Sequence, residues 1–141
     1  MESRLIASSE GVNLYMVQSN MPSKDAETIV FLHGYPDTHS SWEKQLSFFS
    51  KNYRVAAFDI RGAGKSSVPA EQRSYRMSEL LRDTDRIIDE LVGKDGKVHL
   101  VGHDWGSIIF WSYISIPENL RRVLSFSAVA APHPMLFYKN I

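Results

Sequence analysis

Short apolar runs alternate along the chain with longer segments in which apolar positions recur every three or four residues. The short runs have the length and composition of β-strands, and the longer segments have the periodicity of helices. Strands are expected at Leu5–Ile6, Gly11–Val17, Thr28–Leu32, Arg54–Phe58, Lys97–Val101 and Val123–Val129. Helices are expected at Ser41–Ser50, Ser78–Leu91 and Ser107–Ile116. From Thr28 onward the two kinds alternate, which requires crossover connections and predicts a parallel sheet.

Each expected helix has an apolar face. Trp42, Leu46 and Phe49 share one face of the first helix. In the second helix acids and arginines lie opposite an apolar side, which is formed by Leu80, Leu81, Ile87, Ile88 and Leu91. The third helix is apolar almost all round, which predicts a largely buried helix that ends at Pro117.

The composition fits a single domain comprising residues 1–141. Lysine and arginine together number 16, as do aspartate and glutamate, so the formal net charge is zero. This balance argues against a nucleic acid or an anionic membrane as partner, because either favours a basic surface. The absence of cysteine excludes disulfides and thiolate metal sites. Neither a secretory leader nor a membrane-spanning stretch is recognisable, and we expect a cytoplasmic protein.

Three glycine-bearing turns, at His33, Asp59 and Gly102, follow expected strands directly. In parallel sheets ligands bind at the carboxyl ends of the strands, so these turns are the expected site. The second turn, 59–66, contains Gly62 and Gly64 but does not fit a phosphate-binding loop or a dinucleotide fingerprint. The former requires a glycine where Asp59 stands, and the latter requires glycine or alanine where Ser67 stands.

The third turn has the pattern of a nucleophile elbow. Gly102, His103, Asp104, Trp105 and Gly106 lie between an expected strand and an expected helix, with the central residue flanked by small ones. Such a turn strains the central residue and brings two backbone segments so close that a Cβ at either glycine would clash. Asp104 is therefore the candidate nucleophile. The alternative is an ordinary strand-to-helix turn in which Asp104 only caps the helix.

The first turn, His33-Gly34-Tyr35-Pro36, occupies the position at which hydrolases with such an elbow place a second oxyanion donor. The donors would be the backbone amides of Tyr35 and Trp105. The alternative is a plain turn formed by glycine and proline.

Taken together, His33-Gly34-Tyr35-Pro36, the Asp59–Ser66 turn and Gly102–Gly106 resemble the epoxide hydrolase and haloalkane dehalogenase group of the α/β-hydrolase superfamily. The resemblance extends from about Leu5 to Pro134. It implies an α/β-hydrolase core with a mostly parallel sheet and helices on both faces, truncated before the cap domain and the last strands. It implies no cofactor and no metal. The substrates would be water and an apolar small molecule, either an epoxide or an alkyl halide.

An aspartate suits this chemistry, because it is already ionised at neutral pH and can attack an sp³ carbon to form an alkyl ester. A histidine-activated water then cleaves the ester while two amides stabilise the oxyanion. The resemblance assigns the histidine and its acid to late positions in the sequence, and proton donation to cap tyrosines. These lie outside the chain, so we expect 1–141 alone to be inactive. The five histidines present, like Tyr113 and Tyr138, are expected to be structural.

Two alternatives remain. A dehalogenase would use the same nucleophile, with Trp105 as a possible halide contact, although Tyr35 fits the second halide position poorly. A non-catalytic module, or a segment of a multidomain protein, is the alternative of another class, since some relatives carry a short-chain dehydrogenase after the hydrolase. We also expect self-association through 123–129, because the apolar residues of this strand would have neither a partner strand nor a covering helix. These residues are Val123, Leu124, Phe126, Ala128, Val129, Ala130 and Ala131.

Overall fold

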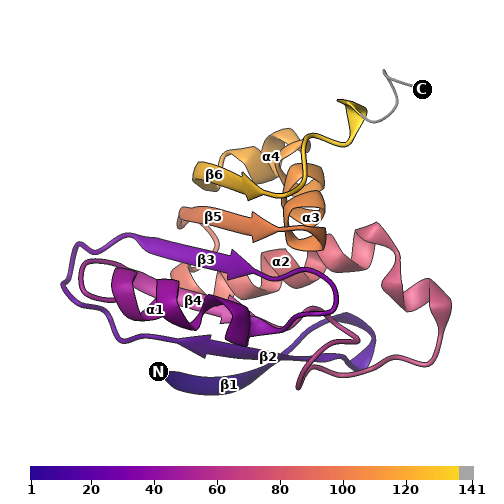
Figure 1. Cartoon of the computed structure of the whole chain (residues 1–141), viewed down its shortest axis with the longest axis horizontal. Helices are drawn as coiled ribbons and strands as arrows, with labels where there is room; N and C mark the ends of the chain where they lie inside the picture. Colours follow the sequence, from indigo (N-terminus) through magenta and orange to yellow (C-terminus); the bar gives the residue numbers. More distant parts are fainter. Residues whose placement is uncertain (137–141) are drawn as a thin grey trace.

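The chain forms a six-stranded sheet with the strand order β1-β2-β4-β3-β5-β6 in a computed structural model that describes residues 1–136 (Figure 1). The strands are β1 (Glu2–Ala7), β2 (Asn13–Gln18), β3 (Thr28–Leu32), β4 (Arg54–Phe58), β5 (Val98–His103) and β6 (Val123–Val129). β1, β2 and β4 pair antiparallel, whereas β4, β3, β5 and β6 pair parallel. The sheet is therefore mostly parallel, as predicted.

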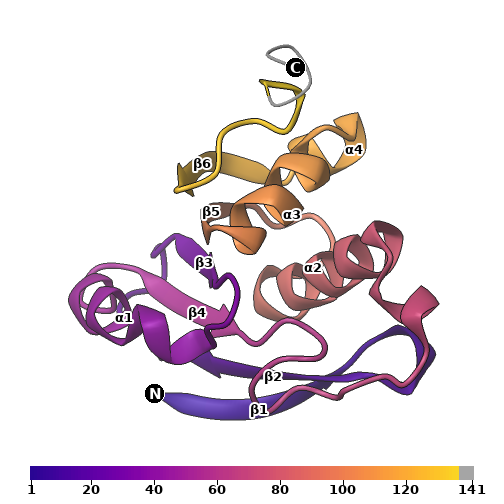
Figure 2. The same ribbon diagram turned by 45° about the vertical axis from the view of Figure 1, so that its right-hand side comes forward.

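Helices cover both faces of the sheet. They are α1 (Glu43–Phe49), α2 (Met77–Val92), α3 (Trp105–Ile114) and α4 (Pro117–Leu120), together with the 3₁₀ turns η1 (Ser9–Gly11), η2 (His39–Trp42) and η3 (Gln72–Tyr75). Figure 2 shows α1 on one side of the sheet and α2, α3 and α4 on the other. This is the architecture that the resemblance implied.

The sheet separates two apolar cores, because alternate residues of each strand point to opposite faces. Val30 and Leu32 of β3 pack toward α2 and α3, where they join Ile88 and Phe110. The intervening Phe31 packs toward α1, against Trp42 and Leu46. All five residues of β3 are buried, as expected for a central parallel strand covered on both faces.

Some element ends differ from the sequence-based expectation. Gly11 belongs to η1 rather than to β2, and the helix expected from Ser41 begins as the 3₁₀ turn η2. α3 starts at Trp105 and ends at Ile114. Pro117 does not end that helix but opens α4, because a proline at the first helical position lacks only an amide that would be unpaired there.

The acids of α2 are not all on a solvated face, which corrects the sequence-based assignment. Glu79 and Asp83 are buried, whereas Leu80 and Leu81 are only partly buried. The two acids are buried because the guanidinium of Arg61 lies against them. Periodicity alone could not show a partner so distant in the sequence.

The expectation for β6 was also partly wrong. α3 covers one side of this strand, where Phe126 packs edge-on against Phe110 and Trp111. Val123 packs against the core and Ala131 is buried. β6 nevertheless lies at the edge of the sheet, since in the described part of the chain it pairs only with β5.

Candidate active site

The three glycine-bearing turns meet at the carboxyl edge of the parallel strands. β3 runs directly into His33, β4 into Asp59, and β5 ends at His103, beside Asp104. Because β3 is paired with β4 on one side and β5 on the other, the three turns are neighbours at that edge. This is the position at which α/β sheets bind ligands.

Asp104 has the strained backbone of a nucleophile elbow, with φ 54° and ψ −118°. The flanking glycines make this conformation possible. A Cβ at Gly102 would lie 2.6 Å from the amide nitrogen of Ser107, and one at Gly106 would lie 2.8 Å from the carbonyl oxygen of His33. The backbone of α3 therefore contacts the end of β3 directly, and any side chain at these two positions would force the segments apart.

The side chain of Ser107 holds the elbow in place through hydrogen bonds to the backbone. Its fully buried hydroxyl donates to the carbonyl of Gly102 at 2.6 Å and accepts from the amide of Val129 at 3.2 Å. The amide of Asp104 donates to the carbonyl of Val129 at 3.0 Å. One side chain thus joins the end of β5, the start of α3 and the end of β6.

The turn after β3 supplies a donor to the candidate nucleophile. The amide of Tyr35 donates to Oδ2 of Asp104 at 3.0 Å. The Asp104 side chain makes no capping hydrogen bond within α3, so the geometry does not favour the helix-cap alternative. The backbone amide of Tyr35 and then that of Trp105 hold the pKa of Asp104 below its ordinary value near 3.8, against a smaller opposing effect of burial, and the nearby His103 acts in the same direction as the amides.

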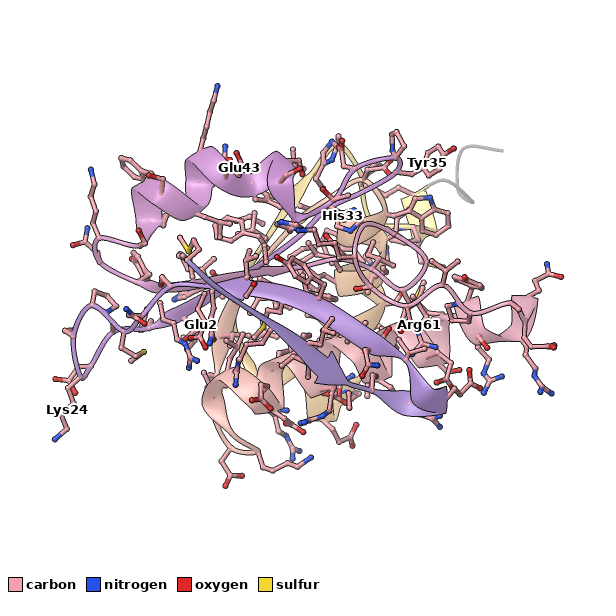
Figure 3. All side chains as sticks on the ribbon, turned by 90° about the horizontal axis from the view of Figure 1, so that it is seen from below. Glu2, Lys24, His33, Tyr35, Glu43 and Arg61 are labelled. Atoms are coloured by element: carbon pink, nitrogen blue, oxygen red, sulfur yellow. The ribbon has the colours of Figure 1, made fainter. Side chains whose placement is uncertain are left out.

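A cavity of about 520 Å³ opens beside these amides, and its wall is mostly apolar. The wall includes the first two turns together with Tyr75, Leu80, Trp105 and Ile109. The side chains of Tyr35 and Trp105 are 80% and 50% exposed, so they stand at the rim and not in the core. In Figure 3 Tyr35 points outward, whereas His33 lies inside the fold.

The second turn is held by two buried charged residues. Asp59, which is fully buried, accepts hydrogen bonds from the backbone and ring of His39 at 2.7 and 2.8 Å, and from the amide of Lys65 at 2.9 Å. Arg61 makes a bidentate pair with Asp83 at 2.7 and 2.6 Å and also donates to the carbonyl of Ser74. These contacts anchor the cavity wall to α2 and to the chain before it.

Ser107, Asp59 and Arg61 were not among the site residues proposed from the sequence. Asp59 and Arg61 lie in a turn that the sequence did single out, at the end of a strand, and that position is the signal that marks them. Ser107 carried no signal, because its role depends on a contact with β6 that sequence spacing does not reveal.

Four of the five histidines make hydrogen bonds to groups other than the Asp104 carboxylate, and the fifth, His103, precedes Asp104 in the chain. In residues 1–136 no histidine hydrogen-bonds to that carboxylate. His33 contacts Gly34 and Ile60, His39 contacts Asp59, His99 contacts Glu27 and Ser125, and His133 accepts from the amide of Met135. His103 is half-buried next to Asp104 in the chain. The buried Tyr113 donates to Asp85 and packs in the core, and Tyr138 lies outside the described residues.

Neither a metal site nor a membrane span is evident in this part of the chain. Over residues 1–136, no three histidine or acidic side chains converge as metal ligands would. Nor does any helix there combine the length and apolarity needed to cross a bilayer.

Comparison with known proteins places this geometry among hydrolases. The family model of the alpha/beta hydrolase fold matches residues 27–140. The chain is 39% identical over 114 residues to epoxide hydrolase 4 of Mus musculus. The aligned region covers 80% of this chain and 30% of that protein. It is 37% identical over 130 residues to the probable oxidoreductase EphD of Mycobacterium tuberculosis, covering 92% of this chain and 22% of that protein.

A solved structure is similar over nearly the whole chain. It is described as one of several novel epoxide hydrolases of the alpha/beta hydrolases superfamily from metagenomes of hot environments. The match has a TM-score of 0.85 and 35% identity, and covers 98% of this chain and 45% of that one. The chain spans 22% and 30% of the length of the two curated relatives named above. The fold, the elbow and these matches together establish that the chain belongs to the alpha/beta hydrolase fold family and corresponds to the amino-terminal portion of that fold.

Proposed function

We propose that this chain carries the nucleophile and oxyanion hole of an epoxide-hydrolase-type enzyme, with Asp104 as the nucleophile. The observation that carries the proposal is the Asp104 carboxylate, held on a strained elbow with Oδ2 bonded to the amide of Tyr35. Relatives named epoxide hydrolases support the substrate class. The mostly apolar cavity is lined by Tyr35 and Trp105, whose amides act on the carboxylate, and it suits a small uncharged substrate.

The two carboxylate oxygens of Asp104 have different roles in this proposal. Oδ2 accepts the Tyr35 amide, which leaves Oδ1 to attack. A lone pair of Oδ1 forms a bond to an epoxide carbon while the carbon–oxygen bond of the ring breaks, and the departing alkoxide oxygen takes a proton from solvent water. The product is an ester between Asp104 and the substrate. Because the pKa of Asp104 is lowered, the carboxylate is ready to attack without a base.

In the second step water adds to Cγ of Asp104, and negative charge moves onto the ester carbonyl oxygen. That oxygen is Oδ2, which already accepts the amide of Tyr35, and the amide of Trp105 acts on the same carboxylate and would be the second oxyanion donor. This step needs a base for the water, and no histidine in residues 1–136 hydrogen-bonds to the Asp104 carboxylate, on which His103 acts only through its charge. We therefore propose that the 141-residue chain alone forms the ester and does not turn over.

Intact-mass spectrometry of the purified chain tests this function. Incubation with a small aryl epoxide should add one equivalent of epoxide mass, located by peptide mapping on Asp104, with no sustained release of diol. Asp104→Asn and Asp104→Ala should remain unmodified. An adduct on another residue, or diol formation by the alanine variant, would show that the assignment of Asp104 is wrong.

The same assay separates epoxide from halide chemistry. A dehalogenase would also form an ester on Asp104, with an alkyl halide and release of halide. The exposed edge of Trp105 at the cavity rim is the feature that favours this second candidate. Alkylation by a bromoalkane but not by the epoxide would replace the first proposal with the second.

A further inference from the structure

The ring of His33 is buried between two of the turns and is hydrogen-bonded at both nitrogens. Nδ1 lies 2.8 Å from the carbonyl oxygen of Gly34, and Nε2 lies 3.0 Å from the amide nitrogen of Ile60. A carbonyl oxygen can only accept and a backbone amide can only donate. The ring must therefore carry its proton on Nδ1 and leave Nε2 unprotonated, which makes it the neutral Nδ1–H tautomer.

The carbonyl that His33 contacts belongs to the same peptide group as the amide of Tyr35. The carbonyl of Gly34 and the amide of Tyr35 are the two ends of one planar peptide unit. At the other end of that unit the Tyr35 amide donates to Oδ2 of Asp104 at 3.0 Å. A continuous chain of hydrogen bonds thus runs from the Ile60 amide through His33 and this peptide to Asp104.

Hydrogen bonds in such a chain strengthen one another, because each polarises the next group. The Gly34 carbonyl also accepts the amide of Asp37 at 2.9 Å, so its orientation is fixed from two directions. Donation to this carbonyl withdraws electron density from the peptide and makes the Tyr35 amide a better donor.

We infer that His33 is a positioning residue, whose neutral Nδ1–H tautomer orients and polarises the Gly34–Tyr35 peptide and so strengthens the hydrogen bond from Tyr35 to Asp104. In the resting protein the consequence is a lowered pKa of Asp104. The catalytic part of the inference rests on the proposed function. In ester hydrolysis the same amide would stabilise the oxyanion on Oδ2, so His33 would act chiefly on the second step.

The electrostatic surroundings agree with a neutral ring. Burial is the largest influence and lowers the pKa of His33 below its ordinary value of 6.5, with His39 acting in the same direction. The Gly34 carbonyl, Asp59 and Asp37 act in the opposite direction but do not reverse the shift. Protonation would also place a proton on Nε2 against the Ile60 amide, which itself needs an acceptor there.

Two amide substitutions separate the contacts of the ring. The amide of asparagine reaches about the place of Nδ1, so His33→Asn keeps a donor for Gly34 and loses the acceptor for Ile60. The amide of glutamine reaches about the place of Nε2, so His33→Gln keeps the acceptor for Ile60 and loses the donor for Gly34. His99→Gln is the matched control, because His99 contacts Glu27 and Ser125 and not the Gly34–Tyr35 peptide.

Carbon-13 titration of the Asp104 carboxyl group in the protein tests the inference without any epoxide. His33→Gln should raise the pKa of Asp104 toward its ordinary value, whereas His33→Asn and His99→Gln should leave it low. Equal pKa values for Asp104 in the two His33 variants would overturn the inference, since a ring that only fills space cannot distinguish them.

A nitrogen-15 spectrum of the unmodified protein covers the case in which the His33 variants do not fold. It should show the Nδ1–H tautomer of His33 at neutral pH, and an Nε2–H tautomer or an imidazolium would overturn the inference. In a longer form of the protein that completes the epoxide reaction, His33→Gln should slow ester hydrolysis about tenfold and change ester formation less. This effect is smaller than the loss of rate expected when an oxyanion donor is removed. The titration and the tautomer do not depend on epoxide chemistry, so they remain decisive if the proposed function fails.

Discussion

Gly34 lies against the side chain of Asp104 so closely that a Cβ atom on Gly34 would stand 2.5 Å from Oδ2 of Asp104. This oxygen also accepts the amide of Tyr35. The turn after β3 can therefore approach the elbow only because position 34 has no side chain. This close approach depends on the glycine at position 34, so a substitution there tests its importance.

Gly34→Ala should slow the formation of the Asp104 ester by about 100-fold, because either Asp104 or the Tyr35 amide must move. The rate is measured from the growth of the adduct in intact-mass spectra. Gly93→Ala is the control, since Gly93 ends α2 with a positive φ and has no atom within 4 Å of an added Cβ. It should lower the unfolding free energy without changing the ester rate. An unchanged rate in Gly34→Ala would contradict the importance of the close approach.

The rate of ester formation should be independent of pH across the neutral range. The pKa of Asp104 lies below 3.8, so the carboxylate stays ionised until the pH falls below that value. The rate should then decline, because the protonated acid is a poor nucleophile. Ester formation measured from pH 3 to pH 9 in steps of about one unit checks this profile. A decline already between about pH 6 and pH 7 would indicate that another group, such as a histidine, controls the first step.

Asp83→Ala should lower the free energy of unfolding by about 3–5 kcal/mol, because it leaves the guanidinium of Arg61 buried without its bidentate partner. Urea denaturation followed by circular dichroism measures the loss. The double variant Arg61→Met with Asp83→Leu should recover much of it, since apolar side chains of similar size can replace a buried pair. A loss below about 1 kcal/mol in Asp83→Ala would mean that water or another acid compensates Arg61.

The 141-residue chain should self-associate through β6. This strand is a sheet edge whose Leu124 and Val129 are 45% and 46% exposed, and from Val123 to Ala131 it contains neither charge nor proline. Light scattering over a dilution series should show an apparent mass that rises with concentration. Ser127→Lys places a charge on the edge and should keep the chain monomeric. A wild-type chain that stays monomeric throughout the series would refute the prediction.

The periodicity of the sequence predicted the bounds of the inner strands well and the ends of the helices less well. The bounds of β3, β4 and β6 coincide with the runs Thr28–Leu32, Arg54–Phe58 and Val123–Val129. The central strands β3 and β4 are buried along nearly their whole length and are therefore continuous apolar runs with sharp limits in the sequence. The start of α3 was misplaced by two residues, because helical geometry begins directly after Asp104, within the elbow pattern to which Trp105 and Gly106 were assigned.

In the candidate site, too, some features could be predicted from the sequence and others could not. The glycine spacing indicated that Asp104, Tyr35 and Trp105 belong to neighbouring turns, and the structure brings these three residues together. The pairing of Arg61 with Asp83 could not be predicted, because residues of a loop and a helix that are distant in sequence meet only through the tertiary fold. The contact of Ser107 with Val129 was hidden for the same reason.

The donors to the Asp104 carboxylate are main-chain amides, while the side chains on those same residues border the cavity and extend into solvent. Residues 35 and 105 therefore each contain two parts with separable tasks. Substitution of either side chain by another non-proline residue alters the shape and polarity of the cavity rim and leaves a hydrogen-bond donor at the same place in the backbone. If the two amides form the oxyanion hole as proposed, an enzyme built on this arrangement can acquire new substrates by mutation at residues 35 and 105 without losing either donor.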